Sequence, residues 1–383
     1  MTGMAAPPHV FMVSLDRSLA GEGGTDAVAR HTRYAEVLQG PLSVVVVTPP
    51  GFQHLKINER LETFPTNARG LIGHARSIFY YYRIIRRAKP IHLLIAQDLA
   101  APVMLLLKWF TKLPLLVNIH GVWWDSWFSK KGWRHRWYLP IMVFVFKNAD
   151  AVRVVSHHLR RELIKRGLHA RRIHVIPTPV NLIRFMRSRP EALEEVQRKI
   201  PSPFVLAVGR LEYEKGFDQL LFAWELLQQQ KINAHLAIVG EGSKRSALEA
   251  WVHDHHLEAS VTFMGRIASE SLPPFYHAAR CVALASRSES FGKVLVEAGA
   301  AGKASVATNT HGAAEIIQNG TTGYLIPQGG MKAFAEKLAR VISDPVRTEE
   351  MGSKARARVM QIYDGEKNSE KLVRLWKRMA RAS

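Results

Sequence analysis

Three loops in the second half of the sequence carry residue types that could hold a phosphorylated ligand. The first has Gly209, Arg210 and Lys215 between an apolar run and a helical pattern. A glycine permits a tight turn after a strand, and two cations close to the start of a helix suit a diphosphate. The same residues would also form an ordinary basic turn in water, so this loop alone leaves both interpretations open.

The second loop gives a weaker signal. Gly240 follows the apolar run 235–239 and precedes a helical pattern. Glycines that follow a parallel strand often serve only the turn itself. Gly240 is therefore a candidate for ligand contact only together with the neighbouring loops.

The third loop carries most of the chemistry. Glu289 and Glu297 are separated by about two helical turns along one face of a helix. Between them, Gly292 lets backbone N–H groups approach a ligand at the positive end of that helix. Carboxylates accept hydrogen bonds from hydroxyls and helix-start amides bind phosphate, so a ligand with a sugar, a diphosphate and a ribose would satisfy the whole loop. The alternative is a capped surface helix, but Glu297 lies in an apolar stretch, where a carboxylate needs a partner.

The elements that must position these loops are strands and helices in alternation. Two successive series of this kind predict an α/β fold with two doubly wound parallel sheets, in which ligands bind beyond the carboxyl ends of the strands. The expected strands of the first series are Val10–Leu15, Ser43–Thr48, His92–Ala96, Leu115–Ile119, Ala151–Val155 and Ile173–Ile176. Those of the second series are Phe204–Val208, His235–Val239, Val261–Met264, Cys281–Ala285, Ser305–Ala307 and Gly323–Ile326.

The same alternation predicts the division into domains. We expect an N-terminal domain over residues 1–185 and a C-terminal domain over 203–364. Residues 186–202 are charged and contain Pro190 and Pro201, with Pro203 directly after them, which favours a linker. A basic helix over 365–383 has one apolar face, with which we expect it to pack back on the N-terminal domain.

The composition excludes several classes of protein. With 47% hydrophobic and 22% charged residues, the chain is typical of packed globular proteins. Its single cysteine, Cys281, excludes an internal disulfide and a zinc site built from several thiolates. No secretory signal is visible, and the longest apolar runs are shorter than the ~20 residues that span a bilayer. We therefore expect a cytoplasmic protein without a transmembrane helix.

The net charge of +21 is concentrated in residues 1–185 and points to a polyanionic partner such as lipid headgroups, nucleic acid or a phosphorylated acceptor. Residues 123–137 interleave five tryptophans with lysines and arginines, and residues 76–87 combine tyrosines with arginines. Tryptophan with basic residues is typical of a membrane-interface anchor, although these tryptophans could also pack internally. The basic residues of the tryptophan cluster are Lys130, Lys131, Arg134 and Arg136.

The motifs of the second half occur in an order that resembles a known family. They are Gly209-Arg210-Leu211, Glu214-Lys215-Gly216-Phe217-Asp218, Gly240-Glu241-Gly242, Val261-Thr262-Phe263-Met264-Gly265, Ser288-Glu289-Ser290-Phe291-Gly292 with Glu297, Ala314-Glu315-Ile316-Ile317 and Gly323-Tyr324-Leu325. This series resembles the retaining GT-B glycosyltransferases (glycosyltransferase group 1, family 4 type), which include enzymes of cell-envelope and lipid-linked glycan biosynthesis. The resemblance covers the whole second domain and is looser in the first.

The resemblance implies a GT-B fold, in which two Rossmann-like domains face a central cleft. It implies a retaining enzyme that moves a sugar from a UDP- or GDP-sugar to a lipid-linked or membrane-anchored glycan acceptor. Such a protein would lie peripherally on the inner face of the cytoplasmic membrane and bind an anionic membrane surface. The donor motifs assign the cleft to a nucleotide sugar, so nucleic acid is not expected as a partner. The alternatives are a GT-B synthase or phosphorylase with a soluble acceptor, and a sugar-nucleotide or membrane-binding module without turnover.

The family roles carry over to matching positions as implications. Arg210 and Lys215, next to Gly209, would hold the donor diphosphate, and Glu297 would bind the ribose. Glu289 and the amides from Phe291 through Gly292 to Lys293 would hold the donor sugar and the distal phosphate, with Gly240 nearby and with Arg266 and Ile267 at the base. In the first domain the matching positions are Gly23 and Gly24 in a glycine loop beside the diphosphate, His120 beside the donor sugar, and Ser156 in a lesser role.

The implied mechanism needs no metal and no cofactor. Arg210, Lys215 and the helix amides would stabilise the leaving diphosphate, and the acceptor would attack from the front face. The sequence departs from the family pattern in the turn 178–181 and at His311-Gly312, where a Gly-Gly pair is common. The second departure leaves the identity of the donor sugar open.

Overall fold

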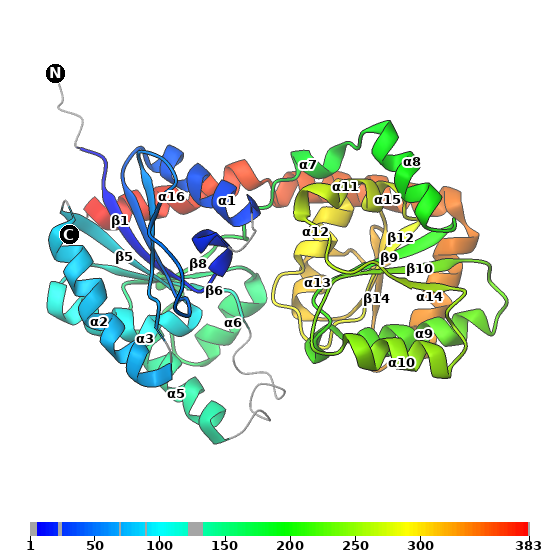
Figure 1. The fold of residues 1–383 in the computed structure, drawn as a ribbon, viewed down its shortest axis with the longest axis horizontal. Coiled ribbons are helices and arrows are strands. Elements are labelled where there is room, and N and C mark those ends of the chain that lie inside the picture. Colours follow the sequence, from blue (N-terminus) through cyan, green and yellow to red (C-terminus); the bar gives the residue numbers. More distant parts are fainter. Residues whose placement is uncertain (1–5, 22–24, 69, 89, 122–132, 382–383) are drawn as a thin grey trace. The chain divides into compact units, whose positions relative to one another are not determined.

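The computed structural model describes residues 6–21, 25–68, 70–88, 90–121 and 133–381, and it divides the chain into two compact units. The first unit comprises Met1–Pro177 and Glu366–Ser383, and the second comprises Thr178–Gly365. Each unit is a sheet with helices on both faces (Figure 1). This is the architecture that alternating strand and helix patterns predict.

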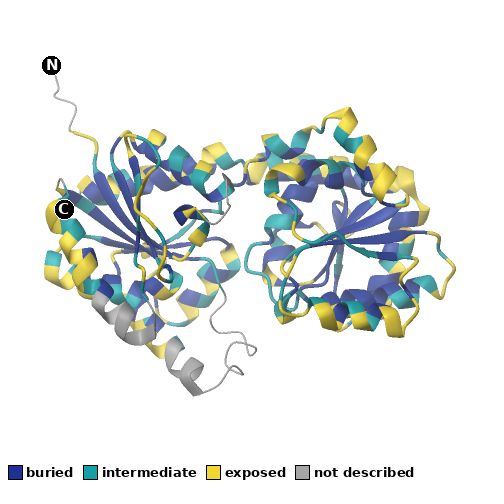
Figure 2. Ribbon diagram, in the orientation of Figure 1, coloured by how far each residue is buried: buried dark blue, intermediate teal, exposed yellow. Residues whose placement is uncertain are grey.

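The sheet of the first unit has the strand order β3-β4-β2-β1-β5-β6-β7-β8. All neighbours pair in parallel except β3, which is antiparallel to β4. The central strands are buried on both faces, which explains their continuous apolar sequences (Figure 2). The strands are β1 His9–Ser14, β2 Leu42–Val46, β3 Leu55–Lys56, β4 Leu61–Pro65, β5 Ile91–Gln97, β6 Leu115–Ile119, β7 Ala151–Val154 and β8 Ile173–Val175.

Helices α1 and α16 cover one face of this sheet, and helices α2, α3 and α5 lie on the other (Figure 1). On the second face, Tyr81 of α2 meets Phe11 of β1 edge to face, with ring centroids 6.3 Å apart. A further helix, α6, follows β7. The bounds are α1 Thr25–Leu38, α2 Gly70–Arg87, α3 Ala101–Thr111, α5 Trp133–Asn148, α6 His157–Lys165 and α16 Gly365–Arg381.

Helix α16 supplies part of the core of the first unit. Trp376 is fully buried and packs edge to face on Tyr34 of α1, with ring centroids 5.3 Å apart. Leu372 and Leu375 of the same helix are buried in the same cluster, which also contains Val10 and Met12 of β1. The end of the described chain is therefore built into the unit that its beginning forms.

The sheet of the second unit is entirely parallel, in the order β11-β10-β9-β12-β13-β14. Trp224 of α9 anchors the cluster on one face, and Tyr276 of α11 lies in the cluster on the other. The strands are β9 Phe204–Val208, β10 His235–Val239, β11 Val261–Phe263, β12 Cys281–Leu284, β13 Ser305–Thr308 and β14 Gly323–Ile326. The helices are α7 Ile183–Met186, α8 Pro190–Lys199, α9 Phe217–Gln228, α10 Arg245–Asp254, α11 Pro273–Ala278, α12 Lys293–Ala300, α13 His311–Ile316, α14 Met331–Ser343 and α15 Pro345–Ile362.

The structure corrects the expected linker over 186–202. This segment contains α8, which packs against α11 and buries Val196 and Ile200. Pro190 does not break the helix, because it occupies the first turn, where its missing N–H would have had no helical partner. The boundary between the units accordingly lies after Pro177 rather than after residue 185.

Within the described residues, no helix is both long and apolar enough to cross a membrane.

Candidate active site

The three loops of the second unit are joined by backbone contacts where their strands end. Gly209 donates its N–H to the carbonyl of Val239 at 3.0 Å, and Gly240 donates to the carbonyl of Gly265 at 2.8 Å. A Cβ atom on Gly240, whose φ is +149°, would overlap the carbonyl oxygen of Gly209. The structure thus gives Gly240 a packing reason of its own, since only glycine allows these two turns to lie so close.

The first and third loops meet through a salt bridge that sequence spacing does not reveal. Lys215 Nζ lies 2.6 Å from Glu289 Oε2, and both side chains are mostly but not fully buried. The other oxygen of Glu289 accepts the N–H of Gly292 at 3.2 Å, directly ahead of α12. Helix α12 begins at Lys293, so the positive end of its dipole lies beside this carboxylate. A cation, a carboxylate and the positive end of a helix therefore meet at one point.

At His311-Gly312, the glycine that the sequence retains has a steric cause. Gly312, in the first turn of α13, donates its N–H to the backbone carbonyl of Glu289 at 2.8 Å. A Cβ atom there would lie 2.7 Å from the backbone nitrogen of Phe291. Gly312 thus lets α13 pack directly on the loop that carries Glu289.

The buried carboxylate of Glu297 has the partners that its apolar setting requires. The hydroxyl of Tyr276 donates to Glu297 Oε2 at 2.7 Å, and Lys293 Nζ lies 3.3 Å from Oε1. Burial, followed by the charge of Glu297, holds the pKa of Tyr276 well above its ordinary value. Tyr276 therefore stays a neutral donor, and the ionised carboxylate is fixed in one orientation.

Arg210 and Lys215 differ in their surroundings, although the sequence places them in one loop. The Arg210 side chain is 71% exposed, and its Nη2 lies 2.7 Å from Glu214 Oε1, whereas Lys215 lies inward against Glu289. Arg287 lies outside the motifs that predicted the site. It donates to the carbonyl of Tyr213 at 2.9 Å and to Asp218 with both terminal guanidinium nitrogens. Arg287 therefore fastens the third loop to the first.

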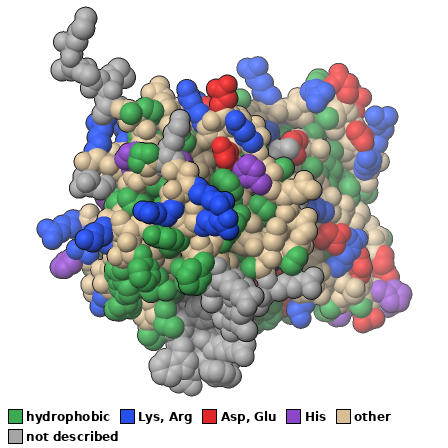
Figure 3. All heavy atoms as spheres, turned by 60° about the vertical axis from the view of Figure 1, so that its left-hand side comes forward, with side chains coloured by type: hydrophobic (Ala, Val, Ile, Leu, Met, Phe, Trp, Pro, Cys, Tyr) green, Lys and Arg blue, Asp and Glu red, His purple; other side chains and the backbone are tan. Residues whose placement is uncertain are grey.

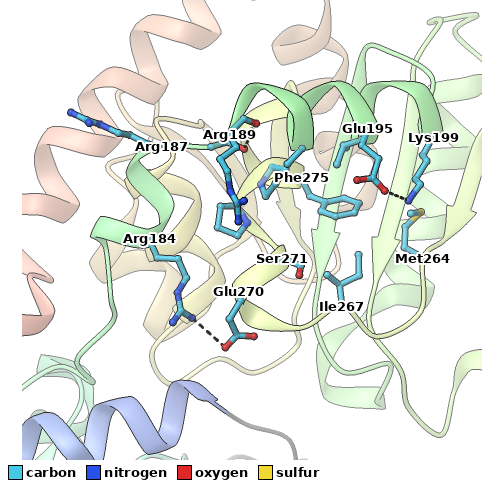
Figure 4. Close-up of a pocket in the computed structure, with 15 residues that line it drawn as sticks. Arg184, Arg187, Arg189, Glu195, Lys199, Met264, Ile267, Glu270, Ser271 and Phe275 are labelled. Atoms are coloured by element: carbon cyan, nitrogen blue, oxygen red, sulfur yellow. Dashed lines mark hydrogen bonds and ion pairs between the residues drawn. The ribbon is translucent and has the colours of Figure 1, made fainter.

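A cavity of about 610 Å³ opens beside Ile267, one of the two positions that we expected at the base (Figure 4). Its wall includes α8, the segment that we had expected to be a linker. Two of its lining residues, Arg184 and Glu270, form an ion pair of 3.9 Å. Arg266, the other expected position, follows Gly265 and is exposed, outside the cavity lining.

In the first unit, the ring of His120 lies between the side chains of Asp98 and Arg153. Its Nδ1 lies 3.2 Å from Asp98 Oδ2, and its backbone N–H donates to Asp98 Oδ1 at 2.9 Å. Its Nε2 lies 2.9 Å from Arg153 Nη1. Asp98 has a φ of +43°, which is rare outside glycine and points to a constrained site.

The partners of His120 fix the tautomer of its neutral ring. A guanidinium can only donate, so His120 Nε2 accepts from Arg153 and the proton of a neutral ring lies on Nδ1, facing Asp98. Arg153 is 2% exposed and also donates from Nε to the carbonyl of Ile176 at 2.7 Å. Burial lowers the pKa of Arg153 to about 10, which leaves it charged at neutral pH. In this arrangement, both ring nitrogens of His120 already have protein partners.

The remaining candidates of the first unit have simpler positions. Ser156 caps α6, with its hydroxyl accepting the N–H of Leu159 at 3.3 Å. Gly23 and Gly24 lie outside the described residues, as do residues 122–132 of the tryptophan cluster. Asp98 and Arg153 belong to none of the predicted motifs. Arg153 nevertheless interrupts the apolar run 151–155, just as Glu297 interrupts the apolar stretch around it.

Two family models match the chain. The one described as Glycosyl transferases group 1 matches residues 188–358, and the one described as Glycosyltransferase Family 4 matches residues 33–184. Among curated proteins, the chain is similar to the GDP-mannose-dependent alpha-(1-6)-phosphatidylinositol monomannoside mannosyltransferase of Mycobacterium tuberculosis, with 30% identity over 256 residues. The aligned part is 63% of this chain and 64% of that relative, so the chain spans less than two thirds of the relative's length.

Solved structures show the same fold. Sucrose-phosphate synthase from Thermosynechococcus elongatus superimposes with a TM-score of 0.86 at 22% identity, over 98% of this chain and 100% of that one. The Anabaena protein HepE in complex with UDP-glucose gives 0.78 at 20% identity, over 97% of this chain and 99% of that one. The predicted fold class, two Rossmann-like parallel-sheet domains of the GT-B type, is confirmed.

Proposed function

We propose that this chain, which belongs to the group 1 glycosyltransferases, transfers a sugar from a nucleoside diphosphate donor that its second unit holds. The observation that carries the proposal is the Lys215–Glu289 salt bridge at the start of α12. A cation and helix-start amides bind a diphosphate, and a carboxylate beside them accepts hydrogen bonds from sugar hydroxyls. UDP-sugars and GDP-sugars both fit this chemistry, because each carries a diphosphate and a sugar.

The proposed transfer is retaining and independent of a metal. The bond from the sugar C1 to the diphosphate oxygen breaks, and C1 forms a bond to the acceptor oxygen on the same face. The acceptor proton passes to the leaving diphosphate. Lys215, the amides from Phe291 to Lys293 and, more weakly, the exposed Arg210 stabilise the negative charge that develops on this leaving group.

The nucleoside end of the donor is assigned to Glu297 and the segment after β11. Glu297 is oriented by Tyr276 and Lys293, and we assign it to the ribose hydroxyls. We assign Arg266 and Ile267 to the base, with the cavity beside Ile267 next to it. In the first unit, we assign His120 to the sugar, with Asp98 and Arg153 as positioning residues that hold its ring.

For the acceptor we propose a lipid-linked or membrane-anchored glycan, with the protein peripheral on the cytoplasmic membrane. The high positive charge of the chain supports an acceptor at an anionic surface. The relative from Mycobacterium tuberculosis, whose name gives a phosphatidylinositol mannoside as substrate, supports a lipid-bearing acceptor.

The test is release of the nucleoside diphosphate from a panel of UDP- and GDP-sugars, with and without lipid extracts as the acceptor source. We expect release with one donor, unchanged by EDTA, and an α-product from an α-donor by NMR. Glu289→Gln should abolish release while UDP or GDP still binds by calorimetry, whereas Glu336→Gln, on an exposed position of α14, should behave as wild type. If no nucleotide sugar is turned over or raises the melting temperature, the assignment of the second unit is wrong.

A further inference from the structure

Helices α2, α3 and α5 expose an unusual number of large apolar side chains. Phe79 of α2 is 78% exposed and Phe110 of α3 is 75% exposed, although residues of this type are ordinarily buried. Figure 3 shows hydrophobic side chains gathered on this side of the first unit. The described members of this aromatic face are Phe79, Tyr80, Tyr82, Leu106, Trp109, Phe110, Ile141 and Phe144.

The aromatic face is separate from the stripes that hold these helices to the sheet. Helix α2 turns Ser77 and Tyr81 inward, one turn apart, while Phe79 and Tyr82 point outward. Helix α3 buries Met104 and Leu105 among its inward residues. Since α3 packs against both α2 and α5, the three outward stripes lie on neighbouring helices. Folding of the unit does not require this surface, because the sheet is already covered by the inward stripes.

The charges on these three helices have a single sign. Helix α2 has four arginines, α3 has one lysine, α5 has two arginines and one lysine, and none of them contains Asp or Glu. Every other described helix of eight or more residues contains at least one acidic residue. A random solvated surface would not place its three acid-free helices side by side. The exposed apolar side chains suit insertion into a surface, and the basic residues suit attraction to a surface of negative charge.

We propose that the aromatic face of α2, α3 and α5 docks on an anionic lipid bilayer by inserting its exposed side chains into the headgroup region. Aromatic rings with Arg and Lys around them are the composition that partitions to this interface. The basic residues supply attraction to anionic lipids, and the apolar side chains supply a part of the binding that salt does not screen. This inference deepens the proposed function, since it names how the enzyme reaches a membrane-anchored acceptor, but lipid binding itself needs no turnover.

The experiment is flotation of the full chain with vesicles that contain about one third phosphatidylglycerol, compared with pure phosphatidylcholine vesicles, at low and high salt. We expect strong binding to the anionic vesicles, weak binding to the neutral ones, and a fraction that remains bound at high salt. The variant Phe79→Ser/Phe110→Ser should lose binding by about tenfold or more, because its two most exposed rings no longer insert. The matched control is Phe222→Ser/Val346→Ser, which removes two exposed apolar side chains from the second unit and should bind as wild type.

Separate measurements distinguish this proposal from the proposed function. Both double variants should keep the wild-type melting temperature and the wild-type calorimetric affinity for UDP or GDP. Wild-type flotation by Phe79→Ser/Phe110→Ser would overturn the aromatic face as the docking surface, even if the enzyme were active. Concentration-dependent dimers that this variant abolishes, without flotation of the wild type, would show instead that the face binds a second copy of the chain.

Discussion

The two units have the same layered fold, but they bury charge in opposite ways. Among the described residues of the second unit, the buried charged side chain is an anion, Glu297, and Tyr276 and Lys293 donate to it. Among those of the first unit it is a cation, Arg153, which donates to His120 and to the carbonyl of Ile176. A carboxylate has about four acceptor positions, so it can hold protein donors and ligand hydroxyls together. A guanidinium that donates to protein groups holds those groups in place. The buried carboxylate of the second unit can therefore contact a ligand, whereas the buried guanidinium of the first unit positions protein groups.

The largest expected effect lies in the second unit. Lys215→Ala should lower turnover by about a hundredfold or more, because it removes a preorganised cation from the leaving group and leaves Glu289 unpaired. Arg210→Ala, at an exposed position with a solvent-screened partner, should cost about tenfold or less. Steady-state kinetics with the active donor measure both. Equal losses of turnover in the two variants would mean that the deeper burial of Lys215 does not make it more important for catalysis than Arg210.

The second effect concerns the buried charges themselves. Arg153→Met should destabilise the first unit by about 3 kcal/mol, because His120 Nε2 and the carbonyl of Ile176 lose their donor in a buried place. Glu297→Gln keeps an acceptor oxygen for Tyr276 and should cost about 1 kcal/mol in the second unit.

Hydrogen exchange followed separately in each unit resolves these two free energies of unfolding. Arg153→Lys should recover part of the stability and less of the turnover, since an ammonium cannot reproduce both contacts of the planar guanidinium. Full recovery of turnover by lysine would show that charge alone is required, and the positioning role of Arg153 would then be wrong.

The smallest effect is a pH dependence of the first unit. His31 of α1 is buried, and burial, with Arg30 and His120 adding to it against Asp16 and the carbonyl of Ala27, lowers its pKa from 6.5 to about 4. As the pH falls below 6.5 the unfolded chain takes up the proton first, so stability present above pH 6.5 is lost progressively down to pH 4. The loss should reach about 2 kcal/mol at pH 5.

Thermal unfolding between pH 7 and pH 5 tests this, because His31→Gln should reduce the dependence while His169→Gln, at an exposed position, should leave it unchanged. An unchanged slope in His31→Gln would assign the pH dependence to other groups.

The strand positions and the three loops of the second unit could be predicted from the sequence because they depend on local patterns. The alternation of apolar runs and glycine turns located every strand of that unit to within one residue at each end. Short strands with mixed patterns, such as β3 and β4, and the long polar helix α15 have no comparable signal and were not predicted.

Contacts between distant residues could not be predicted in the same way. Lys215 and Glu289 are 74 residues apart, and only the order of strands in the sheet brings their loops together. Arg153 is different, because a charge within an apolar run demands a partner, and the argument that identified Glu297 applies to it equally. The error over 186–202 also has a physical cause, since Pro190 favours either the end of a helix or its first turn.

The way α16 completes the first unit has a consequence for biosynthesis. Domains generally fold in the order in which the ribosome releases them. Here Trp376, which is fully buried in the core of the first unit, is translated only after the whole second unit. One face of the N-terminal sheet therefore stays incompletely covered on the ribosome until the second unit and then α16 have been synthesised. The unit that is synthesised first can complete its core only after the second unit has left the ribosome.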